Sequence, residues 1–431
     1  MAILIGIAFI SLPIGPYQTP DTQLEFTTVQ GVLKWGYPYV EVKGNFIDVP
    51  PLGFYTEALF FQIFGSTMDN GIILITVFGL ACIVVVYKLG REIYGKSTGL
   101  FAAAFFALSP WELVLTRAFL IDIQCLLLSL VCLYFGILAI RKDSVKLAVV
   151  SGIFFAAAFL TKQYAVFMII PLLLLYIYHR PRNPKQILLQ LSAFSFPAVF
   201  STLYWYQIIM GEELLYLIQH NDFNRSNFQG IVPSYSFITN FLTEYGLGTL
   251  FFAAVVFSFL VGFLFWKSFS KRMMVFELIC LLTVLCILGV NMYLGVNLNL
   301  KAPYTSAVKY SYHSLPFFSL IASSLAIKST LLLKSYIRNS SKLKKYLYFI
   351  VGLIGLLFLG TPILENMITA QWLTIVPHLI FRVQPELNVG YSFVVLYPIS
   401  HDYFLLNIQF LGFMLVFFGL LWAGRHFALD A

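Results

Sequence analysis

Long apolar stretches separated by short polar gaps dominate this sequence. Each stretch approaches the ~20 residues that an α-helix needs to cross the ~30 Å hydrocarbon core of a bilayer. The pattern therefore predicts an all-α fold, a polytopic transmembrane helical bundle of about twelve spans. The stretches lie at 2–17, 71–87, 98–114, 119–140, 147–161, 164–178, 188–210, 247–266, 274–296, 310–327, 346–363 and 404–423.

Composition supports a multi-pass integral membrane protein. Of the 431 residues, 60% are hydrophobic and 11% are charged, whereas a soluble domain carries roughly 25% charged residues. An aromatic content of 17% excludes the disordered and fibrous classes. The five cysteines lie in or beside apolar stretches without CxxC spacing, so we interpret them as packing residues.

The charged residues orient the chain across the membrane. With Met1 inside, most Lys and Arg residues fall on inner loops, in clusters at 88–96, 141–146, 180–185, 267–272 and 328–345, while most acids fall outside. Cytoplasmic loops are rich in Lys and Arg. Residues 147–178 are expected to form two helices, because a single helix of that length would measure ~48 Å, against a hydrocarbon core of ~30 Å. A single helix would also move every later loop to the opposite side of the membrane, and most Lys and Arg residues would then lie outside. Lys162 is then expected at the outer surface, in a tight turn.

The outer side carries three long segments, at 18–70, 211–246 and 364–403. The first contains two short amphipathic stretches, around 22–34 and 54–64, which we expect to lie as helices in the membrane interface. We find neither an internal repeat nor a low-complexity linker, so residues 1–431 are expected to form one integral membrane domain. Any chemistry should then occur on the outer face, which is extracytoplasmic at the cell membrane or faces the lumen of a compartment.

Two acids follow the first predicted span. Asp21 could accept a proton from an acceptor hydroxyl at the membrane surface, and Glu25 lies one helical turn later. An ordinary explanation is also available, because Thr22 and Glu25 have the spacing of a capping box and acids suit the first turn of a helix. Asp48 then precedes Pro50-Pro51-Leu52-Gly53-Phe54-Tyr55, where the two prolines favour the start of a helix.

Charged residues also stand at the outer ends of later spans. Arg117 and Asp122 enter the fourth span, and an acid within an apolar stretch is a functional candidate by default, although a buried Arg–Asp pair could simply join two helices. Lys162 and Lys309 are isolated cations at the outer boundary, where a lysine can also extend its ammonium toward water. No HxxxH or HExxH spacing is present, so the sequence gives little support for a metal site and leaves metal dependence open. No P-loop or dinucleotide-binding glycine pattern is present, which argues against a nucleotide-hydrolysing enzyme. We expect no cofactor and no nucleic-acid partner.

These motifs together resemble the GT-C class of integral membrane glycosyltransferases, and within it the dolichyl-phosphate-mannose protein O-mannosyltransferase and aminoarabinose transferase superfamily. That family has an acid after its first span, then an interfacial helix and a Pro-Pro-Leu-Gly-aromatic element, as at Asp21 and at 50–54. Arg117 and Asp122, the Leu-Thr-Lys at 160–162, and Lys309-Tyr310 with Leu315-Pro316 match later family elements in order. The family's frequent second acid is Thr22 here.

The resemblance implies transfer of a sugar from a polyprenyl-phosphate donor to an acceptor hydroxyl on a protein, lipid or glycan, with inversion at the anomeric carbon. Asp21 would be the catalytic base. Arg117, Lys162 and Lys309 would bind the donor phosphate, and neutralising such a leaving group is a usual task of cations. Asp122, Asp48 and Glu25 would support the site.

Two other functions fit the span count. A secondary transporter also has about a dozen spans, but typically shows repeats and ionisable groups near the midplane of the membrane. A lipid-linked glycan polymerase or ligase would use a related donor, and the length of its product would distinguish it.

Overall fold

The structure is a computed structural model that describes residues 20–40, 45–46, 49–107, 109, 112, 115–116, 118–179, 184–205, 258, 271–297 and 311–338. The predicted spans at 2–17, 346–363 and 404–423, most of the span at 247–266, and the outer segments at 211–246 and 364–403 lie outside these ranges.

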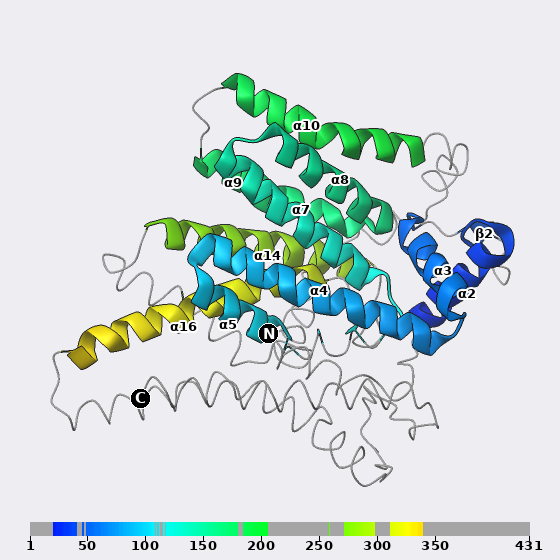
Figure 1. The fold of residues 1–431 in the computed structure, drawn as a ribbon, viewed down its shortest axis with the longest axis horizontal. Coiled ribbons are helices and arrows are strands. Elements are labelled where there is room, and N and C mark those ends of the chain that lie inside the picture. Colours follow the sequence, from blue (N-terminus) through cyan, green and yellow to red (C-terminus); the bar gives the residue numbers. More distant parts are fainter. Residues whose placement is uncertain are drawn as a thin grey trace, which may run out of the picture.

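The described residues are almost entirely helical, as the apolar pattern predicts (Figure 1). The helices are α2 Pro20–Trp35, α3 Leu52–Phe64, α4 Met68–Tyr94, α5 Lys96–Ala107, α7 Asp122–Lys142, α8 Val145–Thr161, α9 Ile169–His179, α10 Pro184–Leu203, α14 Lys271–Asn297 and α16 Leu315–Arg338. Two 3₁₀ turns, η1 Gln163–Met168 and η5 Tyr312–Ser314, precede α9 and α16. Strands β1 Tyr39–Val40 and β2 Asn45–Phe46 pair antiparallel, with Tyr39 opposite Phe46.

Tight turns fold successive helices back on one another. Gly95 has φ +109 between α4 and α5, a backbone conformation that glycine adopts at little steric cost. Asp143 ends α7 with φ 49, and the Ser144 hydroxyl then accepts a hydrogen bond from the Leu147 amide to cap α8. Consecutive long helices therefore run antiparallel, with their connections alternating between the two ends of the bundle (Figure 1).

Helices long and apolar enough to cross a membrane confirm part of the predicted bundle. Among the described residues they are Met68–Tyr94, Asp122–Lys142, Lys185–Leu203 and Lys271–Val290, and shorter apolar helices cover Leu52–Phe64, Val145–Thr161 and Gln163–His179. Residues 147–178 are divided as predicted, because α8 ends at Thr161 and α9 begins at Ile169. The two amphipathic stretches of the first outer segment are helical, as α2 and α3.

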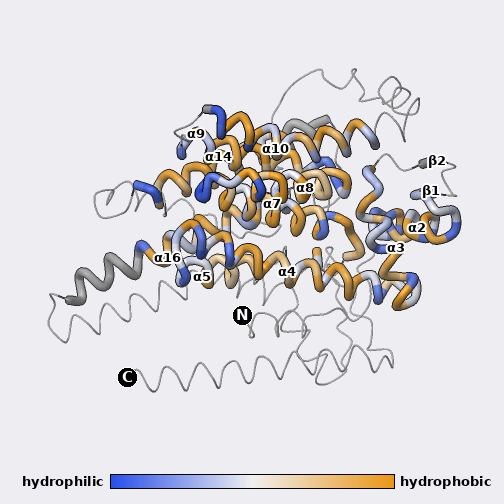
Figure 2. Tube along the Cα trace, turned by 45° about the horizontal axis from the view of Figure 1, so that its top comes forward, coloured by the Kyte–Doolittle hydropathy of each residue, from blue (hydrophilic) through white to orange (hydrophobic). Residues whose placement is uncertain are grey.

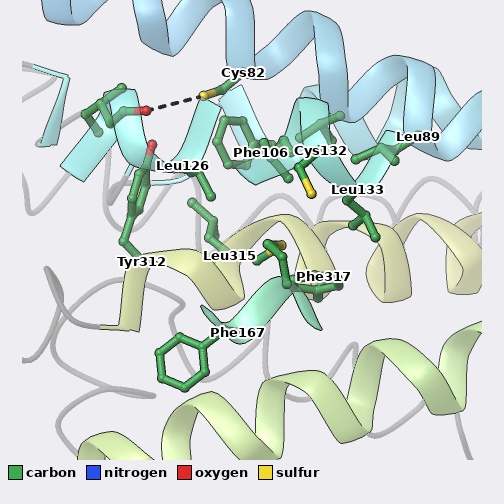
Figure 3. Close-up of a cluster of buried hydrophobic side chains, with 14 of the residues drawn as sticks. Cys82, Leu89, Phe106, Leu126, Cys132, Leu133, Phe167, Tyr312, Leu315 and Phe317 are labelled. Atoms are coloured by element: carbon green, nitrogen blue, oxygen red, sulfur yellow. Dashed lines mark hydrogen bonds between the residues drawn. The ribbon is translucent and has the colours of Figure 1, made fainter. Parts of the chain in front are cut away.

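A cluster of apolar side chains holds α4, α5, α7 and α16 together (Figure 3). Phe106 from α5, Leu126 from α7 and Phe317 from α16 are all buried. Glycines allow neighbouring backbones to approach closely elsewhere in the bundle. A Cβ atom on Gly99 would lie 2.6 Å from the backbone oxygen of Tyr87, so α4 and α5 pack with almost no side chain between them there.

One end of the bundle, here named the basic end, carries many Lys and Arg residues, and hydrophilic positions gather at helix ends in Figure 2. Arg141 at the end of α7 forms an ion pair with Glu92 near the end of α4, with an N–O distance of 2.5 Å. Arg272 at the start of α14 donates to the Glu92 carbonyl oxygen at 3.2 Å. These bonds fix the ends of three helices beside one another.

The charge pattern was interpreted wrongly at Lys328, which was assigned to an inner loop. Helix α16 continues past this residue, and Lys328 is fully buried. Its ammonium lies 2.6 Å from a carboxylate oxygen of Glu277 on α14 and donates to the carbonyl oxygen of Ser258 at 3.0 Å. A buried acid can neutralise a lysine inside the bundle, and the sequence pattern cannot show that pairing.

We expect Gly99→Ala to destabilise the protein in detergent by about 1–3 kcal/mol, because the new methyl group would meet backbone atoms that cannot move aside. The measurement is the midpoint of thermal unfolding. Gly289→Ala on α14 is the matched control, since a Cβ at Gly289 meets nothing within 4 Å. Equal midpoints for the two variants would contradict the close packing of α4 against α5.

Candidate active site

A buried ion pair lies at the end of the bundle opposite the basic end. Lys162 directs its ammonium to both carboxylate oxygens of Asp122, at 2.9 and 2.8 Å. The exposed fraction of Asp122 is 0% and that of Lys162 is 6%. Two charges this far from water are stable only when each compensates the other.

Local backbone geometry brings the two charges together. Asp122 is the first residue of α7, and Lys162 follows the last residue of α8, which runs back alongside α7. At Lys162 the chain becomes extended, with φ −162 and ψ 141, while its amide still donates to the Ala158 carbonyl oxygen at 2.9 Å. The helix therefore ends where its lysine can reach the start of α7.

The Pro-Pro-Leu-Gly element packs against the same place. A Cβ atom at Gly53 would lie 2.7 Å from Cγ2 of Ile121 and 3.3 Å from Cγ2 of Thr161. Those two residues immediately precede Asp122 and Lys162. Three motifs separated in the sequence, at 50–55, 116–122 and 160–162, thus meet around one ion pair.

Helix α2 contributes two of the predicted acids. Glu25 is buried, and its Oε2 accepts a hydrogen bond from the Ile121 amide at 2.8 Å. This bond satisfies one of the free amides at the start of α7 and places a negative charge at its positive end. Asp21 lies in the first turn of α2, is partly exposed, and is four residues from Glu25, so the two acids share a helix face.

The remaining predicted site residues have different outcomes. Arg117, Lys309 and Asp48 lie outside the described residues. Lys162 occupies the predicted turn, but it is buried and paired, so its predicted position at the outer surface was wrong. Arg117 was one expected partner of Asp122, and the structure shows an ion pair between Asp122 and Lys162.

Sequence reasoning missed three buried polar residues near this site. The Tyr312 hydroxyl donates a hydrogen bond to Oε2 of Glu112, which joins the segment before α7 to the start of α16. His313 follows directly, with an exposed fraction of 0%, and its Nε2 lies 3.5 Å from Sγ of Cys125. The available signal was the position of Glu112 and His313 inside predicted apolar spans, where a polar side chain needs a partner or a function.

Glu57 on α3 was also missed. It is fully buried, and neither carboxylate oxygen has a hydrogen-bond partner. Burial raises the pKa of Glu57 well above its ordinary value, and the nearby Glu25 carboxylate raises this pKa further. Burial therefore favours the neutral form of the Glu57 carboxyl.

Among the described residues, no group of three or more His, Cys, Asp or Glu side chains is arranged to hold a metal ion.

Comparison with known proteins agrees with the motifs. Residues 48–205 match the family model of the dolichyl-phosphate-mannose-protein mannosyltransferases. This segment is similar to that glycosyltransferase family. The match begins beside the Pro-Pro-Leu-Gly element and includes both members of the Asp122–Lys162 pair. It confirms the resemblance inferred from the sequence. No curated protein matches the chain.

Solved structures are similar to this chain at low sequence identity. The archaeal oligosaccharyltransferase AglB from Archaeoglobus fulgidus, in complex with an inhibitory peptide and a dolichol-phosphate, is 13% identical with a TM-score of 0.50, over 93% of this chain and 59% of that one. ArnT from Cupriavidus metallidurans bound to undecaprenyl phosphate is 15% identical with a TM-score of 0.48, over 76% and 59%. The chain thus spans about 60% of the length of these proteins, and the AglB similarity shows a GT-C-like fold.

We expect Glu57→Gln to raise the midpoint of thermal unfolding relative to wild type, and to raise it more at pH 8 than at pH 5. The folded-state pKa of Glu57 is raised, so the wild type loses stability as pH rises from the unfolded pKa toward the folded one, whereas glutamine does not titrate. Glu92→Gln is the control, because Glu92 is partly exposed and paired with Arg141. A difference between wild type and Glu57→Gln that does not change with pH would contradict the neutral buried acid.

Proposed function

We propose that this protein is a membrane glycosyltransferase that moves a sugar from a polyprenyl-phosphate donor to an acceptor hydroxyl on the non-cytoplasmic face, with inversion. One observation carries the proposal: three family motifs meet around the buried Asp122–Lys162 pair, at the start of α7 and the end of α8. AglB was solved with a dolichol-phosphate, and the similarity of residues 48–205 to the mannosyltransferase family supports a polyprenyl-phosphate donor for this chain.

The proposed face follows from the distribution of charge. Arg141 and Arg272 meet at Glu92 at the basic end, whereas the Asp122–Lys162 pair lies where α7 begins and α8 ends, at the other end of these helices (Figure 1). Because Lys and Arg are enriched on the cytoplasmic side of membrane proteins, the candidate site faces away from the cytoplasm. The apolar tail of a lipid donor can then remain in the bilayer while its phosphate reaches the site.

In the proposed reaction the acceptor oxygen attacks the anomeric carbon, and the bond from that carbon to the phosphate oxygen breaks. The electron pair of that bond leaves with the polyprenyl phosphate. Asp21, partly exposed on α2, takes the proton of the acceptor hydroxyl. Lys162, with Arg117 and Lys309, neutralises the charge that develops on the phosphate. Asp122 holds the Lys162 ammonium in place before the donor binds, and Glu25 and Asp48 complete the surroundings of the base.

The first test of this proposal is release of free polyprenyl phosphate by the purified protein from a labelled polyprenyl-phosphate sugar. A secondary transporter would release none. A glycan polymerase or ligase would transfer a chain rather than a single sugar, so the mass of the product separates it from the proposed enzyme.

We expect Asp21→Asn to reduce transfer at least ~100-fold, a loss typical of removing a general base, with normal membrane expression. Transfer is measured as product formed from the labelled donor in membranes. Asp69→Asn is the matched control, because Asp69 is also an acid in the first turn of a helix at this end of the bundle. Near-normal turnover in Asp21→Asn would refute its role as the base.

We expect Lys162→Met to weaken binding of the donor lipid and to destabilise the protein, because it leaves Asp122 buried without its cation. Breaking a buried pair in this way costs about 3–5 kcal/mol. The double variant Asp122→Asn with Lys162→Met should recover stability without recovering donor affinity, and Lys146→Met, an exposed lysine near the start of α8, should affect neither. Ordinary donor affinity in the stable double variant would remove Lys162 from the phosphate site.

A further inference from the structure

His313 is a buried histidine with one ring nitrogen that has no hydrogen-bond partner. Its exposed fraction is 0%, and Nδ1 is among the buried polar atoms without a partner. Leaving such a group unsatisfied costs free energy, so an orphan nitrogen in a folded protein requires an explanation. A ligand that completes the hydrogen bond is the simplest explanation when the residue borders a candidate site.

His313 does border the candidate active site. Its ring contacts the Tyr164 ring, with centroids 6.2 Å apart, and the Lys162 ammonium lies 5.6 Å from the centroid of that same ring. Cys125, which touches the other ring nitrogen of His313, is one helical turn after Asp122 on α7. The histidine therefore belongs to the same buried polar cluster as the ion pair.

The surrounding bonds determine which ring nitrogen carries the proton. The Cys125 sulfur lies 3.5 Å from the carbonyl oxygens of both Ala158 and Lys162, which can only accept hydrogen bonds, so the thiol proton points to them. The sulfur then presents lone pairs to Nε2 of His313, which must carry the hydrogen. Nδ1 is consequently the bare nitrogen and acts as an acceptor.

The position of the ring is fixed on both sides along the chain. The Tyr312 hydroxyl is bonded to Glu112, and the Ser314 hydroxyl donates to the Ser311 carbonyl oxygen at 2.6 Å. All three residues of η5 are buried. The acceptor is thus held on a rigid element, as a group that discriminates between ligands must be.

We propose that Nδ1 of His313 accepts a hydrogen bond from a hydroxyl group of the donor's sugar. This inference rests on the proposed function and assigns part of its donor site. A phosphate oxygen without a proton cannot donate to a bare nitrogen, whereas every hexose carries hydroxyl donors. His313 therefore recognises the sugar of the donor, while Arg117, Lys162 and Lys309 bind its phosphate.

The test compares lipids with and without a sugar. The probes are undecaprenyl phosphate and its mannosyl, glucosyl and galactosyl derivatives, and the measurement is the Kd of each for the full chain in detergent. His313→Phe removes both nitrogens, His313→Gln keeps a polar group near Nε2, and His313→Asn keeps one near Nδ1. Thermal unfolding of each variant reports whether the fold is retained.

We expect wild type to bind at least one sugar lipid more tightly than undecaprenyl phosphate. His313→Phe and His313→Gln should each weaken that sugar lipid about tenfold, the usual effect of one lost hydrogen bond to a ligand, and leave undecaprenyl phosphate unchanged. His313→Asn should retain sugar affinity within about threefold.

Several results would overturn the inference. They are equal weakening of all four lipids, no weakening in His313→Phe, or a wild type that binds no sugar lipid more tightly than undecaprenyl phosphate. If a variant fails to fold, Cys125→Ala provides the same comparison, because it frees the proton on Nε2 to move and should weaken only the sugar lipids. Failure of wild type to bind any of the four lipids would instead contradict the proposed function.

Discussion

The rest of the described structure depends on compensating charge in an apolar interior. Asp122 and Lys162 are both buried, and an isolated ion in such surroundings costs several kcal/mol. Their pairing constrains where α7 begins and where α8 ends, because a shift of one turn, ~5.4 Å, in either helix would separate the two charges. Helices α3 and α2 pack against the same helix ends. Gly53 of α3 lies close to Ile121 and Thr161, and the Ile121 amide donates to Glu25 of α2.

A second buried ion pair lies in the part of the bundle where α14 and α16 meet. Lys328 and Glu277 neutralise one another with an exposed fraction of 0% and 2%. The Ser258 hydroxyl donates to Glu277, and the Lys328 ammonium donates to the Ser258 carbonyl oxygen. The Asp122–Lys162 pair differs because it adjoins the motif segments, the buried Glu25 that bonds to Ile121, and a histidine with an unpartnered ring nitrogen. Burial and pairing alone thus do not mark a site, and the neighbouring groups distinguish the two pairs.

Much of the fold could be predicted from the sequence. The apolar lengths give the helices, and the length limit of a membrane-crossing helix correctly divides residues 147–178. The motifs at 50–55, 117–122 and 160–162 lie within the segment 48–205 that matches the family model, whereas Asp21 and Lys309-Tyr310 lie outside it. The partners of buried polar residues could not be predicted, because helical periodicity gives the face on which a side chain lies and not the residue of another helix that it meets. Glu57, Glu112 and His313 were missed for this reason, and Lys328 was placed in a loop.

The sequence by itself determined a helical membrane protein, the order of its motifs and the family that residues 48–205 resemble. These properties follow from local composition and motif spacing, both of which can be seen in the sequence itself. Only the tertiary structure decided that Asp122 meets Lys162, that Glu25 bonds to the start of α7, and that His313 lies against Cys125. Such contacts join residues 40 to 188 positions apart, and they form only because helix packing brings distant segments to one end of the bundle.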